Sequence, residues 1–269
     1  MVLDSPHSGV DYPSDFNHHV DLVALRRAED THVEKLYDFA PALGAGWVEA
    51  LFPRSYLDPN RHLSEIDVSM MDGVWTGPVA NDGVFLNKIK IGKGLIWRTT
   101  DEQVPIYQRQ LSVTEVQARI QNYWQPYHDA VAQAIETAHA SHGYNIHINC
   151  HSMPSVATSE GMGQSGEVYA DFVIGDRDGT TANPALSRLV CQHLEACGYN
   201  VAYNYPYKGV ELVRRYSNPA KNRHSIQVEI NRKLYMNEDT RELIRGSESL
   251  KTHLRSLVNL LLQTDPRAL

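Results

Sequence analysis

Cysteines are scarce in this sequence. Its 269 residues include three, Cys150, Cys191 and Cys197, which are too few and too irregularly spaced for a disulfide framework or a CxxC metal-binding knuckle. Apolar runs are short as well, since none approaches the roughly 18 residues that a membrane-spanning helix needs. The first residues also lack the basic and apolar segments of a secretion signal. We therefore expect a reduced, cytoplasmic protein that has no membrane partner.

Basic residues are in the minority. Lys and Arg total 25 against 32 Asp and Glu, a formal net charge of −7, which gives no general affinity for nucleic acid because that affinity needs a basic surface. Hydrophobic residues at 42% and charged residues at 21% are typical of soluble globular proteins. No internal repeat or Gly/Ser-rich linker interrupts the sequence. We expect a single domain over residues 1–269.

The first half of the chain predicts a helix, a short strand and a region of loops. Apolar residues recur at helix-compatible spacing over 20–44, and Gly44 is a suitable end for that helix. A strand candidate, WVEAL, follows at 47–51. The density of Gly and Pro over 64–110 indicates hairpins and long loops beside the site.

A long helix is predicted in the middle of the chain. Ser112 and Glu115 form an S-x-x-E capping box, which marks the start of a helix. Gly143 is the next end signal. Because Pro126 falls inside this window, we expect a kink or a division into two helices.

The second half alternates strands with helices. In YNIHINCH (144–151) apolar residues alternate with Asn and His, which is typical of a strand with two unlike faces. The further predicted elements are a helix from Asn183-Pro184 to Gly198, the strands YNVAYN (199–204) and HSIQVEI (224–230), and an amphipathic helix over about 238–263. This alternation favours an α/β fold with helices on both faces of a sheet.

Two histidines lie at the ends of strand candidates. His7 follows the apolar run MVL within DSPHSG, and His151 closes the strand that begins at residue 144. Ligands of open α/β sheets bind beyond the carboxyl ends of the strands, so the two imidazoles can converge above one sheet edge. Two histidine nitrogens and a carboxylate, with a further position left to water, are the ligand set of a catalytic Zn²⁺.

The carboxylate is expected from the predicted helix after His7. Glu29, Asp30 and Glu34 are the candidates, and Asp30, Glu34 and Asp38 are spaced i, i+4, i+8 on one helical face. The alternative for each of them is a solvated acidic surface.

Glu229 is the candidate general base. Within SIQVEI, the three apolar residues would face the core, while Gln227 and Glu229 share the other face. A glutamate inside a strand is unfavourable unless it is paired or used; the alternative is a surface residue of an edge strand. If it faces a metal, Glu229 can take a proton from the activated water and pass it to a leaving amine.

Three other signals are set aside. GMGQSG (161–166) matches G-x-G-x-x-G, but it follows a Met-Pro-Ser loop and precedes the strand candidate EVYADFVIG, whereas a dinucleotide motif follows a strand and opens a helix. We interpret it as a loop, or as a flap near the metal. Cys150 alternates onto the apolar face and is interpreted as a core residue. Ser152 lacks the G-x-S-x-G elbow of a serine hydrolase.

Eight segments in this order resemble the N-formylglutamate amidohydrolase (N-formylglutamate deformylase) family over nearly the whole chain. They are SPHSG (5–9), EDTHVEKLYDFAPALGA (29–45), RSYLDPNR (54–61), YWQPYHDAV (123–131), CHSMPS (150–155), GD (175–176), NYPYKGVELVRRYSNP (204–219) and QVEINRKLYMNE (227–238). The resemblance implies a three-layer αβα sandwich with a mixed, mostly parallel sheet, similar to zinc-dependent exopeptidases and amidases. It also implies hydrolysis of N-formyl-L-glutamate to formate and glutamate, in the last step of one histidine-degradation route.

The resemblance further implies roles for individual residues. His7 and His151 match metal ligands, an acidic residue of the EDTHVEKL segment matches the third ligand, and Glu229 matches the base. We prefer Asp30 as the third ligand and keep Glu34 as the alternative, because the phase of the helix decides between them. The expected metal is Zn²⁺, although a site of two histidines and a carboxylate also accepts Fe²⁺ or Co²⁺.

Asn149 departs from the pattern. It stands where we expect an aspartate, two residues before the second histidine. An amide oxygen still accepts a hydrogen bond from an imidazole N–H, but it lacks the charge that raises the basicity of the ligand.

The expected substrate is a small molecule with two carboxylates, which guanidinium groups recognise well. The candidate binding residues are Arg61 first, then Arg214, together with Arg54, Asn60 and Tyr127. For each arginine the alternative is a surface charge or a structural ion pair. Two other functions stay open: an amidase for another N-acyl amino acid or a peptidoglycan fragment, and a binding protein that holds no metal.

Overall fold

The computed structural model describes residues 1–81, 83–157 and 165–269. A six-stranded sheet runs in the order β2-β1-β5-β8-β6-β7. Its strands are β1 (Val2–Ser5), β2 (Gly46–Glu49), β5 (Asn145–Met153), β6 (Phe172–Gly175), β7 (Val201–Tyr203) and β8 (Arg223–Asn231). The pairs β1·β5, β5·β8 and β6·β7 are parallel, and β6·β8 is antiparallel. The predicted α/β fold with a mixed, mostly parallel sheet is therefore confirmed.

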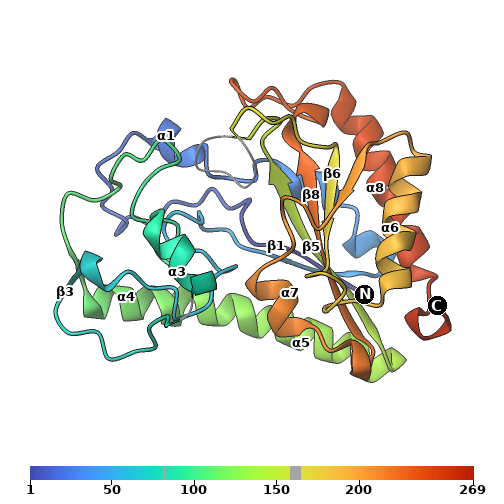
Figure 1. The fold of residues 1–269 in the computed structure, drawn as a ribbon, viewed down its shortest axis with the longest axis horizontal. Helices are drawn as coiled ribbons and strands as arrows, with labels where there is room; N and C mark the ends of the chain where they lie inside the picture. The colour runs from blue at the N-terminus through green and yellow to red at the C-terminus, as the bar shows by residue number, and fades with distance from the viewer. Residues whose placement is uncertain (82, 158–164) are drawn as a thin grey trace. The chain divides into compact units, whose positions relative to one another are not determined.

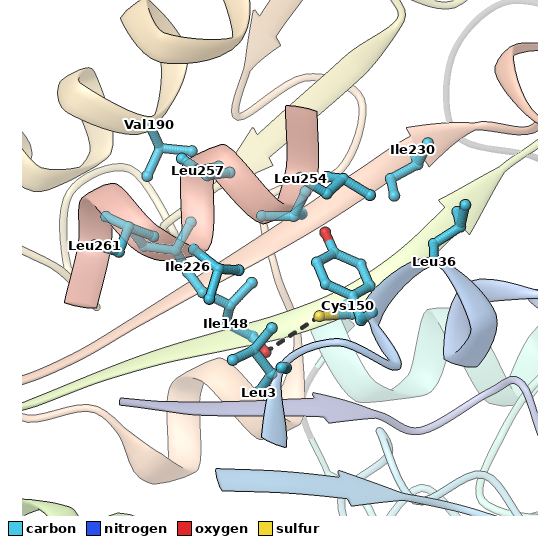
Figure 2. Close-up of a cluster of buried hydrophobic side chains, with 14 of the residues drawn as sticks. Leu3, Leu36, Ile148, Cys150, Val190, Ile226, Ile230, Leu254, Leu257 and Leu261 are labelled. Carbon is cyan, nitrogen blue, oxygen red and sulfur yellow. Dashed lines mark hydrogen bonds between the residues drawn. The ribbon is translucent and has the colours of Figure 1, made fainter. Parts of the chain in front are cut away.

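One face of the sheet is apolar and carries the main core. The helices on this face are α2 (Val33–Tyr37), α6 (Pro184–Ala196) and α8 (Gly246–Leu262). Figure 2 shows side chains of these helices packed on strand residues such as Ile148, Cys150 and Ile226. Cys150 is fully buried in this cluster, which agrees with its interpretation as a core residue. The alternation of apolar and polar residues along β5 and β8 thus predicted correctly which face of the sheet carries the core.

The opposite face of β1, β5 and β8 is polar but also buried. Asp4, His147, Asn149 and Ser225 on this face are all 0% exposed. Helix α7 (Glu211–Tyr216) lies on this side, where the rings of Tyr216 and His147 meet edge to face at 6.4 Å between centroids. Helices therefore cover both faces of the sheet, as expected, and the buried polar groups must find partners there.

Local signals placed several helices correctly. The Ser112 hydroxyl accepts a hydrogen bond from the Glu115 amide at 3.1 Å and begins α4 (Val113–Arg119). A π-helical turn over Ile120–Trp124 then separates α4 from α5 (Gln125–His142), which is the expected division near Pro126. Asn183 caps α6 through a 2.9 Å hydrogen bond from the Ala185 amide.

The prediction of one helix over 20–44 is wrong. The segment forms α1 (Leu22–Arg26), α2 and a 3₁₀ turn at Pro41–Leu43, and His32 just before α2 has a left-handed φ of 68°. The spacing of apolar residues was compatible with a helix, but the left-handed turn breaks the helical hydrogen bonds and turns Glu29 and Asp30 into the interior, where both are 1% exposed. The acidic face of Asp30, Glu34 and Asp38 on a single helix does not exist.

The last predicted helix begins too early, and the loop-rich region contains a helix. Helix α8 starts at Gly246, because residues 236–243 form turns closed by a bridge between Met236 and Leu243. Within 64–110 the structure has antiparallel bridges and, unexpectedly, α3 (Gly83–Lys90). The remaining short elements are β3 (Met71–Asp72), β4 (Leu111–Ser112) and the 3₁₀ turns Val68–Met70, Pro219–Lys221, Arg232–Leu234 and Pro266–Ala268. Of GMGQSG, residues 161–164 lie outside the described residues.

The chain divides into two compact units. The first comprises 1–5, 30–48 and 131–269, and contains β5 to β8 with helices α2, α6 and α8 (Figure 1). The second comprises 6–29 and 49–130. It contains the buried Arg119, whose guanidinium lies 4.0 Å from the ring centroid of Tyr56 and donates a 2.7 Å hydrogen bond to the Tyr107 hydroxyl. Among the described residues, no helix is long and apolar enough to cross a membrane.

Candidate metal centre

His151 lies near the carboxyl end of β5, on the polar face of the sheet. Its Nε2 is 2.7 Å from the Asn149 Oδ1 and its Nδ1 is 2.9 Å from the Asp30 Oδ2, and the side chain is buried. An amide oxygen only accepts hydrogen bonds, so the proton of a neutral His151 sits on Nε2. Nδ1 then carries the lone pair that faces Asp30 and is available to a metal.

Asp30 owes its position to the break between α1 and α2. One of its carboxylate oxygens faces His151, and the other accepts a 3.2 Å hydrogen bond from the Arg232 guanidinium. Arg232 in turn donates to the Ser152 hydroxyl at 3.1 Å. Asp38, by contrast, is exposed and pairs with Lys251 at 2.7 Å. Arg232 thus holds the Asp30 carboxylate in one orientation.

His7 follows β1 with only Pro6 between them, so the chain itself holds His7 at the carboxyl end of this strand. The Nε2 of His7 lies 2.7 Å from Asp58, a carboxylate that also accepts a 3.0 Å hydrogen bond from Arg54. Burial alone would raise the pKa of Asp58, but the charges of His7, Arg54 and Arg61 outweigh it and hold that pKa well below its usual range. An ionised Asp58 orients the His7 ring through Nε2.

His7, Asp30 and His151 form a group of potential metal ligands. One nitrogen of each histidine and one oxygen of Asp30 lie within 4.8 Å of one another, and all three residues are buried. Among the described residues this is the one such group of three His, Cys, Asp or Glu side chains. Two imidazoles and a carboxylate are the ligand set that open, catalytic zinc sites use, so the residues fit a divalent metal ion.

Glu229 is the direct neighbour of His151 across the sheet. The two residues are paired in the parallel register of β5 and β8, and paired residues of neighbouring strands project from the same face. Gln227, two residues earlier on β8, donates a 2.7 Å hydrogen bond to the Glu229 carboxylate, which is 6% exposed. Burial first, and the charge of Glu229 second, raise the pKa of Tyr207. The Tyr207 hydroxyl therefore stays protonated.

The comparisons with known proteins agree with one another. The family model described as N-formylglutamate amidohydrolase matches residues 1–236. The chain belongs to this family. Its curated relatives include the N-formylglutamate deformylases of Pseudomonas putida, 28% identical over 88% of this chain and 82% of the relative, and of Pseudomonas aeruginosa, 27% identical over 97% and 92%. The crystal structure of N-formylglutamate amidohydrolase from Ralstonia eutropha JMP134 superposes with a TM-score of 0.93 at 45% identity, covering 100% of this chain and 94% of that one.

Membership of the N-formylglutamate amidohydrolase family makes the chain a hydrolase of amide bonds. The predicted resemblance is confirmed. A metal-free binding protein does not account for this arrangement, in which three potential metal ligands are grouped and Glu229 is paired with one of them, His151, across the sheet.

Four candidate substrate residues of this amidohydrolase, Arg54, Asn60, Arg61 and Tyr127, lie in the second compact unit. The Arg61 side chain is buried, and its guanidinium donates to the Lys93 carbonyl at 3.0 Å and the Asn60 carbonyl at 3.1 Å. Arg54 donates two hydrogen bonds to Asp58, at 3.0 and 3.3 Å. Asn60 and Tyr127 are also buried.

Arg214 lies in the first unit, on α7. Its guanidinium donates two hydrogen bonds to the buried Glu211, at 2.6 and 3.0 Å, while 41% of its side chain is exposed. In the structure Arg214 therefore forms an ion pair with Glu211, which is one of the alternatives to substrate binding that the sequence left open.

Several residues around the centre were not singled out from the sequence: Asp4, Asp58, Gln227 as a partner of Glu229, and Arg232. For Asp58 a signal existed, because the D-P-N turn of RSYLDPNR places its carboxylate on the Asn60 amide at 2.9 Å, as Asp often does two residues ahead. Asn149, which contacts Asp4, and Asp30, which contacts Arg232, lie more than a hundred residues away from these partners in the sequence, and only the fold brings them together.

Proposed function

We propose that this amidohydrolase hydrolyses the formyl amide of N-formyl-L-glutamate to formate and L-glutamate at a divalent metal site held by His7, Asp30 and His151. The names of the relatives support the substrate. The observation that carries the metal site is the buried group of two imidazole nitrogens and one carboxylate oxygen within 4.8 Å of one another. Asp30, rather than Glu34, is the third ligand in this proposal, because Asp30 faces His151 at 2.9 Å.

When bound, a metal ion at this site supplies Lewis-acid activation of water and of the formyl carbonyl. By ligand type we propose Zn²⁺, with Fe²⁺ or Co²⁺ as substitutes. The protein keeps both ligand imidazoles oriented through hydrogen bonds that their Nε2 atoms donate, from His7 to Asp58 and from His151 to the Asn149 oxygen. Arg232 steadies the carboxylate.

We propose Glu229 as the general base. Its carboxylate accepts a proton from the attacking water and then delivers it to the nitrogen of the departing glutamate. Two features support this role: the register pair with His151, which places both side chains on one face, and the hydrogen bond from Gln227, which limits the orientations of the carboxylate.

The substrate carboxylates are proposed to bind arginines. Arg61 remains the first candidate, because two backbone carbonyls hold its guanidinium in place before substrate arrives. Arg214 is second, since it would have to exchange part of its contact with Glu211 for a substrate carboxylate. Arg54, Asn60 and Tyr127 complete the proposed binding residues.

We further propose that the two compact units belong to one domain. The second unit consists of two insertions, 6–29 and 49–130, within the sequence of the first. A cytoplasmic location is proposed on the cysteine content alone.

A formate-release assay tests this function. The purified protein should release formate from N-formyl-L-glutamate, lose this activity after chelation and regain it with Zn²⁺ or Co²⁺. N-acetylglutamate and a formylated amino acid without the second carboxylate serve as matched substrates and should react far more slowly. Equal rates on the acetyl compound would favour a general N-acyl amidase. Undiminished activity in a strong chelator would contradict the metal site.

A further inference from the structure

The charge that is missing from position 149 is present on the neighbouring strand. Asp4 on β1 is paired in register with Asn149 on β5, and both are fully buried. The Asn149 Nδ2 donates to the Asp4 Oδ1 at 2.9 Å, and the Asn149 Oδ1 lies 2.7 Å from the His151 Nε2. A continuous chain of hydrogen bonds therefore leads from the Asp4 carboxylate through one amide to His151.

The Asp4 carboxylate decides how the amide of Asn149 is oriented. An ionised carboxylate only accepts hydrogen bonds, so the amide NH₂ must face Asp4 and the amide oxygen must face His151. That oxygen in turn requires the His151 proton on Nε2, which leaves Nδ1 with the lone pair directed toward Asp30. Hydrogen bonds in such a chain polarise one another, so the Asn149 oxygen becomes a stronger acceptor.

We propose that Asp4 is a positioning residue of the metal centre, which acts on His151 through the Asn149 amide. The pair Asp4–Asn149 replaces a carboxylate in direct contact with the histidine, and it raises the basicity of the His151 Nδ1 and fixes its tautomer. The proposal rests on the proposed metal site, because its effect is expressed as metal affinity.

A second branch leaves Asp4 and offers a different explanation of its burial. The same Oδ1 accepts a 2.8 Å hydrogen bond from the His147 Nε2, and the His147 Nδ1 lies 2.5 Å from the Ser225 hydroxyl. If Asp4 served only this branch, it would stabilise the sheet without influencing the metal. The two branches diverge at Asp4, so variants can separate them.

The test measures the dissociation constant of Zn²⁺ by chelator competition on metal-free protein, and the visible spectrum of the Co²⁺ form. Asp4→Asn keeps the shape of the side chain but removes the charge, and it should weaken Zn²⁺ binding about 10-fold or more, as loss of such outer partners does in other zinc proteins. Asp4→Asn combined with Asn149→Asp returns a carboxylate to direct contact with His151. This double variant should bind Zn²⁺ within about 3-fold of wild type.

His147→Gln is the matched control, because it disturbs the second branch and leaves the Asp4–Asn149 contact in place. It should keep Zn²⁺ affinity within about 3-fold of wild type, well short of the effect of losing an outer partner. Wild-type affinity in Asp4→Asn, equal weakening in His147→Gln, or no recovery in the double variant would each overturn the proposal. Failure of the wild-type protein to bind Zn²⁺ or Co²⁺ would instead reject the proposed metal site.

If Asp4→Asn does not fold, as judged by circular dichroism, Asn149→Ala carries the same test. That variant cuts the link to His151 and keeps the contact between Asp4 and His147. Zinc binding should weaken about 10-fold or more, and wild-type affinity in this variant would overturn the proposal.

Discussion

Replacing Glu229 with glutamine removes the proposed proton acceptor and changes the shape of the side chain very little. In the structure Gln227 donates to the Glu229 Oε1 at 2.7 Å, and a glutamine at position 229 can still accept that hydrogen bond through its amide oxygen. Glu229 is 6% exposed and lies near the carboxyl end of β8. We therefore expect the variant to fold and to retain metal, since Glu229 is not one of the three proposed ligands.

The expected loss is confined to turnover. General base catalysis contributes on the order of 10²- to 10⁴-fold, which at about 1.4 kcal/mol per factor of ten is a rise of about 3 to 5 kcal/mol in the barrier. Formate release should show kcat reduced by this factor with KM little changed. Glu136→Gln is the matched control, because Glu136 is largely exposed and pairs with Arg223 at the opposite end of β8. A kcat within tenfold of wild type would place the base elsewhere, and loss of metal from Glu229→Gln would make Glu229 a ligand.

Two further predictions concern metal retention and stability. Asp30→Ala should lose the metal on dialysis and Glu34→Ala should keep it, as measured by metal analysis. The reverse result would make Glu34, and not Asp30, the third ligand. Asp176 is buried, and although burial raises its pKa, hydrogen bonds from Tyr203, Asn204, Ser187 and the Gly179 amide hold the pKa below its ordinary value. The ionised Asp176 therefore stabilises the folded state fully above the pKa of about 4 that an Asp has in the unfolded chain. This stabilisation is lost as the pH falls through the lower pKa that Asp176 has in the folded protein. Asp176→Asn should lower the free energy of unfolding at pH 7 by about 1.5 to 3 kcal/mol, as measured by urea titration. At pH 3 the difference from wild type should be smaller. An equal difference at both pH values would refute the stabilising role of the Asp176 charge.

Much of the sheet could be predicted from the sequence because a strand has a period of two residues. The alternation in YNIHINCH and SIQVEI separates apolar from polar positions so strongly that both faces of β5 and β8 were predicted correctly. Caps at Ser112 and Asn183 were also predictable, because each depends on a partner within three residues.

The segment around Asp30 could not be predicted in the same way. Its apolar residues have helix-compatible spacing, but the chain takes a left-handed turn at His32 and buries Asp30 against His151 and Arg232. Distant contacts override local preference there. The resemblance to the family implied an acidic ligand from the EDTHVEKL segment but did not choose between Asp30 and Glu34, and residue spacing placed both on a helical face that does not exist.

The register of the sheet explains how the centre is built from separate parts of the chain. Asp4, Asn149 and Gln227 are paired across β1, β5 and β8 and form one row on the polar face. His151 and Glu229 form the next row, two residues further along. Asn149 contacts His151 and Gln227 contacts Glu229, each along its own strand. One row thus orients the other, and a shift of a single residue in any of the three strands would turn that strand's polar side chains into the apolar core. The register that lets the buried polar groups of this face pair with one another also places the proposed ligand, His151, beside the proposed base, Glu229.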